Sequence, residues 1–116
     1  MKTYMAFYMA SAATVRRLMK MTPEQAKAGF AAWDKWAKAH KKDIVDLGNP
    51  LGRTKRIVPG GAVSDTRNQL TGYSIVRGAS ADAVMKMFRD HPHLSMSGTS
   101  VDVLEVIPMA SLMPKA

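Results

Sequence analysis

Cysteine is absent from the 116 residues, so the chain can form no disulfide, no thiolate metal site and no cysteine nucleophile. Long apolar runs are absent too, and none approaches the roughly 20 residues that a membrane-spanning helix needs. The sequence also lacks the P-loop, the dinucleotide-binding glycine fingerprint and the G-x-S-x-G nucleophile elbow. These absences exclude thiol chemistry and the most familiar signatures of nucleotide-binding enzymes and serine hydrolases.

Acidic residues are scarce, because 17 Lys and Arg stand against 9 Asp and Glu and give a formal net charge of +8. Such a balance favours anionic partners: nucleic acid, anionic lipid or acidic ligands. The cations are spread along the chain, and the densest group is three residues in four at 53–56. We therefore expect no specific nucleic-acid site and no membrane partner, and a nucleic-acid accessory role rests on charge alone.

The length corresponds to one domain, large enough to bury about two-thirds of its unfolded surface. Apolar residues make up 47% and charged residues 22%, a balance typical of globular proteins. We expect a single domain over 1–110 and a C-terminal tail over 111–116. The first 13 residues weakly resemble a secretion signal, but their alternating apolar side chains indicate a strand, and we expect a cytoplasmic protein.

Two segments carry apolar side chains on both strand faces, which is typical of central strands. They are 2–9, where Tyr4 and Tyr8 alternate with Met5 and Phe7, and the closing segment 101–107. Turn residues separate the shorter strands that we expect at 44–47, 53–58 and 72–77, with brief pairing at 62–64 before a polar loop at 65–69.

Two helices are predicted from their start signals. Thr22-Pro23-Glu24-Gln25 combines an N-cap, a first-turn proline and a capping box, and this helix is expected to run to Lys42. Ser80 begins the second helix, which His91-Pro92 ends. The segment 11–21 is a loop or a short helical excursion. In the first helix the predicted buried stripe is Ala26, Phe30, Trp33 and Ala37, with Gly29 and Trp36 beside it.

The predicted order is β-α-β-β-β-α-β, an α+β fold of the ferredoxin-like, split βαβ type with an extra short strand. Its antiparallel sheet has two helices on one face. The second face must also be covered, because the strands at 2–9 and 101–107 are apolar on both sides. A second copy of the chain is the simplest cover, so the pattern predicts a homodimer packed sheet to sheet.

In the order and spacing of these segments the chain resembles the YCII-related domain family, including its DGPF-type branch. The resemblance spans nearly the whole length and implies a ferredoxin-like fold dimerised as an α/β barrel, a cleft between helix-free sheet faces, and mostly unassigned chemistry. It extends to the wider group of dimeric α/β barrel proteins, which includes monooxygenases and dehalogenase-like enzymes. The segments that carry it are MKTYMAFYM, MTPEQAKAGFAAWDKWAKAH, DLGNPLG, DTRNQLTGYSIV, HPHL and SVDVLEVIPM.

Two features of the family are missing. The stretch matching the DGPF tetrapeptide reads Gly60-Gly61-Ala62-Val63. The first-helix histidine that pairs with an aspartate in some members falls near Ala31, Ala32 or Trp33, and His40 lies too close to the following turn to replace it. The catalytic dyad of those members therefore does not transfer residue by residue.

Three residues are candidates for proton transfer. His93 matches the family's Pro-His-Leu segment, and an imidazole with an ordinary pKa of about 6.5 suits acid–base work. Asp102 lies on an otherwise apolar strand face, and Asp65 lies in the acidic-Thr segment. Each also has a structural reading: a loop histidine, a solvated strand-end acid and a turn-capping aspartate. His40 and His91 are interpreted as helix-end residues.

Four residues are candidate ligand contacts. Tyr4, Tyr8 and Tyr73 could supply hydroxyls to an apolar cleft wall, and Arg53 could bind a carboxylate or phosphate. Their structural readings are sheet core and an exposed edge strand. We expect no metal and no cofactor. The function hypotheses are a cofactor-free acid–base enzyme acting on an unknown small molecule, or a non-catalytic ligand-binding or regulatory module using the same cleft.

Overall fold

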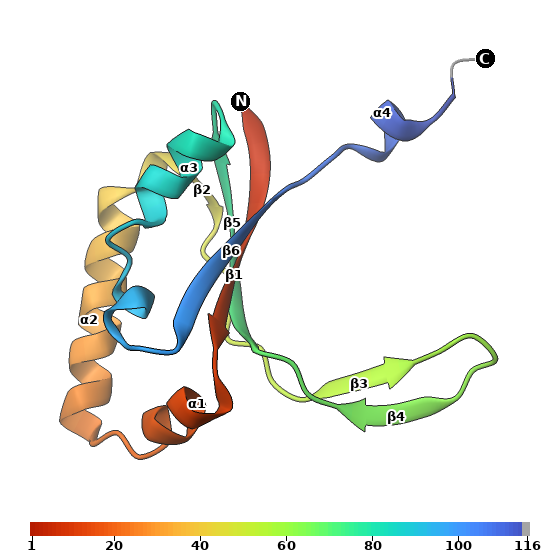
Figure 1. Ribbon diagram of the computed structural model, residues 1–116. Helices are drawn as coiled ribbons and strands as arrows, with labels where there is room; N and C mark the ends of the chain where they lie inside the picture. Colours follow the sequence, from red (N-terminus) through yellow and green to blue (C-terminus); the bar gives the residue numbers. More distant parts are fainter. Residues whose placement is uncertain (115–116) are drawn as a thin grey trace.

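The structure, a computed structural model, describes residues 1–114 as an α+β fold with one four-stranded sheet (Figure 1). The sheet order is β2–β5–β1–β6, and every neighbouring pair is antiparallel. Helix α2 joins β1 to β2 with β5 between them, and α3 joins β5 to β6 with β1 between them, as the split βαβ prediction requires. The elements are β1 (Lys2–Ala10), α1 (Ala12–Leu18), α2 (Pro23–Ala39), β2 (Ile44–Asp46), β3 (Thr54–Ile57), β4 (Val63–Thr66), β5 (Leu70–Gly78), α3 (Ala81–Phe88), β6 (Thr99–Glu105) and α4 (Met109–Leu112), with 3₁₀ turns at Lys41–Asp43 and Pro92–Ser95.

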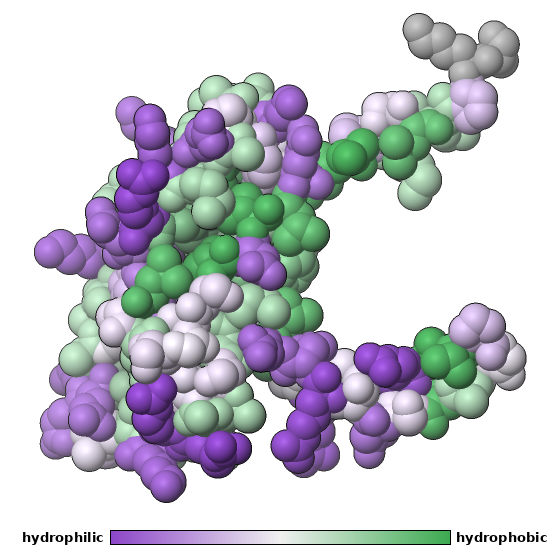
Figure 2. Space-filling model, viewed as in Figure 1, coloured by the Kyte–Doolittle hydropathy of each residue, from purple (hydrophilic) through white to green (hydrophobic). Residues whose placement is uncertain are grey.

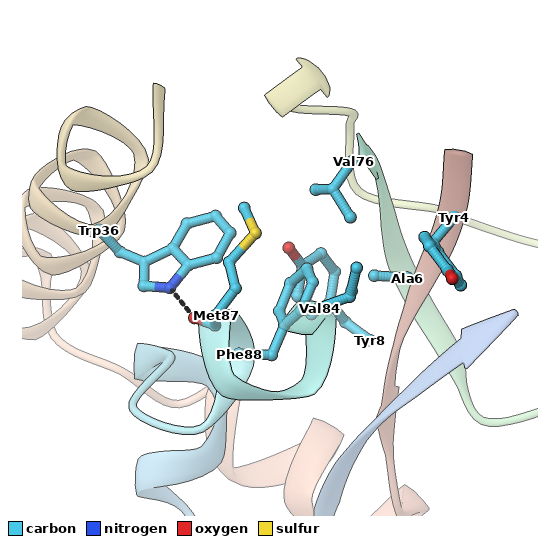
Figure 3. Close-up of a cluster of buried hydrophobic side chains, with 8 residues drawn as sticks. All are labelled: Tyr4, Ala6, Tyr8, Trp36, Val76, Val84, Met87 and Phe88. Carbon is cyan, nitrogen blue, oxygen red and sulfur yellow. Dashed lines mark hydrogen bonds between the residues drawn. The ribbon is translucent and has the colours of Figure 1, made fainter. Parts of the chain in front are cut away.

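The core lies between the sheet and helices α2 and α3, all on one side (Figure 3). Strand β1 alternates strictly, since every second side chain from Tyr4 to Ala10 is buried toward the helices. Val84 and Phe88 of α3 pack on this face, and the Trp36 indole Nε1 donates a hydrogen bond to the Met87 carbonyl at 3.0 Å. A buried aromatic side chain with its polar atom paired stabilises both helices against the sheet.

Helix α2 begins as predicted, and its inward face differs from the predicted one at Phe30. Thr22 and Gln25 form the complete capping box, with hydrogen bonds of 2.9 and 3.2 Å. The helix ends at Ala39, earlier than predicted, and His40 is its C-cap. Trp36 is the buried residue, whereas Phe30, predicted in the buried stripe, is 76% exposed. The other three residues of the predicted stripe, Ala26, Trp33 and Ala37, are half-buried on the inward face.

Two further segments differ from the prediction. Segment 11–21 contains helix α1, whose N-cap Ser11 accepts a hydrogen bond from the Thr14 amide at 3.2 Å. The extra strand does not join the main sheet. Instead β3 and β4 pair only with each other and form a hairpin that projects from the body, so Asp65 lies in β4 and not in a loop (Figure 1).

The chain leaves the body after β6. A hydrogen bond of 2.8 Å from the Val106 amide to the Thr3 carbonyl extends the pairing of β6 with β1 by one residue. Beyond it the backbone extends away from the body and carries the short helix α4 (Figure 1). Both this segment and the β3–β4 hairpin project on the side of the sheet opposite the helices.

Candidate functional site

The face of the sheet opposite α2 and α3 carries side chains in rows that run across three strands. Phe7 of β1 stands between Asp102 of β6 and Tyr73 of β5. The neighbouring row, two residues along β1, is Leu104, Met5 and Ile75. We call these six residues the open face. One carboxylate and one phenol thus lie within an apolar surface that no helix of residues 1–114 covers.

The three tyrosines do not share this face. Tyr73 lies on the open face, whereas Tyr4 and Tyr8 point toward the helices and are buried in the core (Figure 3). The Tyr8 hydroxyl is 2.7 Å from the Ser74 hydroxyl, which donates to the Leu47 carbonyl at 2.6 Å. Burial raises the pKa of Tyr8 to about 12, and the Ser74 hydrogen bond opposes this only in part. Tyr8 therefore stays protonated at neutral pH.

His93 lies at the end of β1, on the helical side of the sheet. Its ring Nε2 is 2.8 Å from the Met9 carbonyl oxygen, which can only accept, so this nitrogen carries the proton. The ring packs edge-on against Tyr8, with centroids 5.3 Å apart. Neither of the two depressions described below is lined by His93.

No carboxylate of the described chain forms a hydrogen bond or ion pair with His93. Asp102 lies on the opposite face, paired in register with Phe7, and Asp65 forms an ion pair with Lys55 at 2.8 Å on the hairpin. The roles predicted for His93, Asp102 and Asp65 in proton transfer stay predictions, and a single chain does not assemble them into one site.

His91 is the buried polar residue whose environment the sequence did not predict. It is 2% exposed and lies among Trp33, Trp36, Tyr8 and Phe88, with ring centroids 4.3 to 5.8 Å away. Its Nδ1 accepts a hydrogen bond from the His93 amide at 2.9 Å, so the neutral ring carries its proton on Nε2. Nε2 has no hydrogen-bond partner in the described chain.

The charge state of His91 follows from this environment. Burial lowers its pKa to about 3, and the charges that His93 and His40 can carry act in the same direction. Its place between a helix end and a proline suggested only a helix stop. The sequence signal that could have indicated the burial of His91 is the pair of tryptophans at helical spacing in α2. Trp33 and Trp36 both contact the His91 ring.

Arg53 lies at the base of the β3–β4 hairpin, beside a shallow depression of about 290 Å³. Lys55 and Asn68 also line it, and Leu51 and Leu70 supply apolar walls. A second depression, of about 280 Å³, lies between α2 and β2 and is lined by Ala37, Lys38, Lys41, Ile44 and Leu47. Within the described residues, no three or more His, Cys, Asp or Glu side chains gather where they could hold a metal ion.

Comparisons with known proteins add little. No family model matches the chain, and no curated protein does either. Among solved structures it is similar to the 5-chloro-2-hydroxyhydroquinone dehydrochlorinase of Burkholderia phenoliruptrix, in complex with 2,5-dihydroxybenzoquinone. That match has 14% identity and a TM-score of 0.49, and it covers 86% of this chain and 90% of the other. A likeness this distant supports no inference about activity or ligand. No helix over residues 1–114 is both long and apolar enough to cross a membrane.

Proposed function

We propose that this chain is a homodimeric, small-molecule-binding protein of the YCII-related kind, in which the open faces of two copies oppose each other. The observation that carries the proposal is the open face itself. Phe7, Tyr73, Ile75 and Leu104 present apolar surface that a soluble monomer would leave in contact with water. A second copy supplies an identical surface, as a two-fold axis requires.

The shape of the chain supports a partner. Its accessible surface is 8870 Å², whereas a compact monomer of this mass exposes about 6,240 Å². Its radius of gyration is 16.7 Å, against about 13 Å for a compact domain of this length. Each copy therefore exposes about 2,600 Å² more than a compact monomer. This area is enough for a stable homodimer interface, which buries about 2,000 Å² or more in total over both copies.

Asp102 supports a ligand between the copies. A carboxylate buried in an interface without a partner costs several kcal/mol, roughly, so two open faces cannot close tightly over it. The row of Asp102, Phe7 and Tyr73 therefore stays a cleft that a ligand can enter. An aromatic ring would lie on Phe7 and Tyr73, and a cationic or hydroxyl group would pair with the Asp102 carboxylate.

Binding is favoured over acid–base catalysis on the same geometry. A general base must reach the proton that it removes, at roughly 3 Å or through one water molecule. One ring nitrogen of His93 is engaged by the Met9 carbonyl, and the ring lies across the sheet from Asp102. We therefore assign the cleft to ligand binding, with Asp102 and Tyr73 as contacts, and leave His93 outside it.

The dimer is tested by light scattering of the full chain and of Phe7→Arg, which places a charge at the centre of the open face. The expected masses are two chains for the natural protein and one for the variant. Phe30→Arg is the matched control, since Phe30 is exposed on α2, and it should stay dimeric. A one-chain mass for the natural protein at micromolar concentration would contradict the dimer.

The cleft is tested by calorimetry with tyramine, an aromatic cation, and with 4-hydroxyphenylacetate, which has the same ring and a negative charge. We expect tyramine to bind more tightly and Asp102→Asn to weaken its binding about tenfold or more. Asp90→Asn removes an exposed acid outside the open face and should leave binding unchanged. Equal tyramine binding by Asp102→Asn and the natural chain would contradict the assignment of Asp102.

A further inference from the structure

Two segments extend from the open side of the sheet, one near each end of its strands (Figure 1). The first, called the hairpin, is residues 53–67 with strands β3 and β4. The second, called the arm, is residues 106–114 with helix α4. Figure 2 shows a wide recess between them, with hydrophobic surface on both. Neither segment packs on the core of its own chain.

The hairpin is held firmly at its base and is uncovered at its tip. The Leu51 amide donates to the Thr71 carbonyl at 2.9 Å, and Pro50 forms a bridge with Gly72. At the far end Ile57 and Val63 pair directly across the two strands and are 70% and 61% exposed. An isolated two-stranded hairpin is marginally stable in water, so this one needs a partner surface.

The arm is equally uncovered and carries no charge from residue 106 to residue 114. Met109 is 77% exposed, and Ile107, Leu112 and Met113 are exposed as well. A continuous apolar segment that projects away from its own core is typical of an interaction site. It extends to the same side of the sheet as the hairpin, beyond the open face, where a second copy would lie (Figure 1).

The charge of the hairpin distinguishes between two possible directions of the two-fold axis. The hairpin carries four cationic side chains against one acid, a net charge of +3, from Arg53, Lys55, Arg56, Arg67 and Asp65. A two-fold axis along the strands would bring the two hairpins together, with like charges side by side. An axis across the strands instead brings each hairpin against the uncharged arm of the other copy.

We propose that, in the dimer of the proposed function on which this inference rests, the arm of each copy lies along the hairpin of the other. The two segments run in opposite directions, because each projects from its own body toward its partner. Ile107 then meets the tip pair Ile57 and Val63, and α4 reaches the depression at the hairpin base, beside Leu51 and Leu70. The contact is isologous, so it occurs twice and closes both ends of the cleft.

The absence of natural cysteine permits a direct test with engineered ones. Chains carrying Ile57→Cys are mixed with chains carrying Ile107→Cys, exchanged under mild denaturant, refolded and treated with a short bismaleimide. The expected product is a covalent dimer of one chain of each kind, identified by mass spectrometry. Met85→Cys, on an exposed position of α3, replaces Ile107→Cys in the matched control and should give no such product with Ile57→Cys.

The outcomes separate this proposal from the dimer itself. If the natural chain is a dimer but cross-links only 57 to 57 and 107 to 107, the axis lies along the strands and the arm–hairpin contact is wrong. If the natural chain is a monomer, the proposed function fails with it. A 57-to-107 product supports both.

The arm is tested independently by replacing Met109, Leu112 and Met113 together with serine. We expect the dissociation constant of the dimer to rise at least tenfold, measured by sedimentation, with an unchanged circular dichroism spectrum. Met19→Ser alters an exposed methionine at the end of α1 and should have no effect. An unchanged dissociation constant in the triple variant would overturn the arm contact while leaving the dimer in place.

Discussion

The neighbouring histidines His91 and His93 differ in what surrounds them. His93 is partly exposed and bonded to a carbonyl, whereas His91 is enclosed by aromatic rings and keeps one ring nitrogen without a hydrogen-bond partner in the described chain. A buried polar atom without a partner is rare and costs free energy. The Trp33 and His91 rings are nearly perpendicular, with their centroids 4.3 Å apart, so His91 is held by aromatic contacts.

The lowered pKa of His91 predicts acid sensitivity. The folded imidazole takes up a proton only near pH 3, whereas the unfolded one does so near 6.5. Between these values the unfolded state binds more protons, so the free energy of unfolding falls as pH falls, by up to about 1.4 kcal/mol per pH unit. Above pH 7 this contribution is constant. Urea unfolding measured from pH 7 to pH 4 should show the slope, and His91→Phe should reduce it.

The control for this prediction is His40→Gln. His40 caps the end of α2 and is partly exposed, so the variant should keep most of the slope. The readout is the pH dependence and not the stability at one pH, because His91→Phe also changes the packing. A slope that is the same in His91→Phe and in the natural chain would show that His91 is not its source.

The two large aromatic side chains Trp36 and Phe30 of helix α2 differ in their contribution to stability. Trp36 fills the space between α2 and α3 and donates to the Met87 carbonyl, whereas Phe30 projects into solvent. Trp36→Phe should lower the free energy of unfolding by about 1–3 kcal/mol, since it leaves a buried carbonyl unsatisfied. Phe30→Ala should change it by no more than about 0.5 kcal/mol. Chemical denaturation measures both, and a larger cost for Phe30→Ala would contradict the orientation of the helix.

The start of α2 and the strands of the sheet could be predicted because their signals are local. Thr22 and Gln25 are three residues apart, and the alternation in β1 is visible within nine residues. The place of Phe30 in α2 could not be predicted, because Phe30 and Trp36 are both large and apolar, and the contact of Trp36 with α3 decides which of them is buried. Likewise, the strand signals at β3 and β4 do not say whether they join the main sheet or leave it.

The candidate site could be predicted in part, because the alternation of side chains along a strand is also a local signal. The alternation of β1 separates Tyr4 and Tyr8 from Met5 and Phe7, but it does not say which set faces the helices. The helices cover the face that carries Tyr4 and Tyr8. Tyr73 pairs with Phe7 and therefore lies on the opposite face. The alternation of 101–107 predicts Asp102 as an acid on an apolar face, and its register with Phe7 places it on the open face.

The fold of one copy is incomplete in its packing. Its surface is about 2,600 Å² larger than that of a compact monomer, and much of its apolar area lies on the open face, the hairpin and the arm. A second copy that covers these surfaces would couple folding to association. The hairpin and the arm would then be ordered only in the dimer, because each relies on the other chain for its apolar contacts.

This coupling predicts that thermal stability depends on protein concentration. When a folded dimer unfolds to two chains, a tenfold rise in concentration stabilises it by about 1.4 kcal/mol, because association is favoured by mass action. For a dimer of this size the melting temperature should rise by roughly 3–6 °C per tenfold increase. Calorimetry or circular dichroism between about 1 and 100 μM measures it, and Phe7→Arg should melt at a lower temperature that does not depend on concentration. A natural chain whose melting temperature is equally independent of concentration would unfold as a monomer, and its open face would then have to be stable in water.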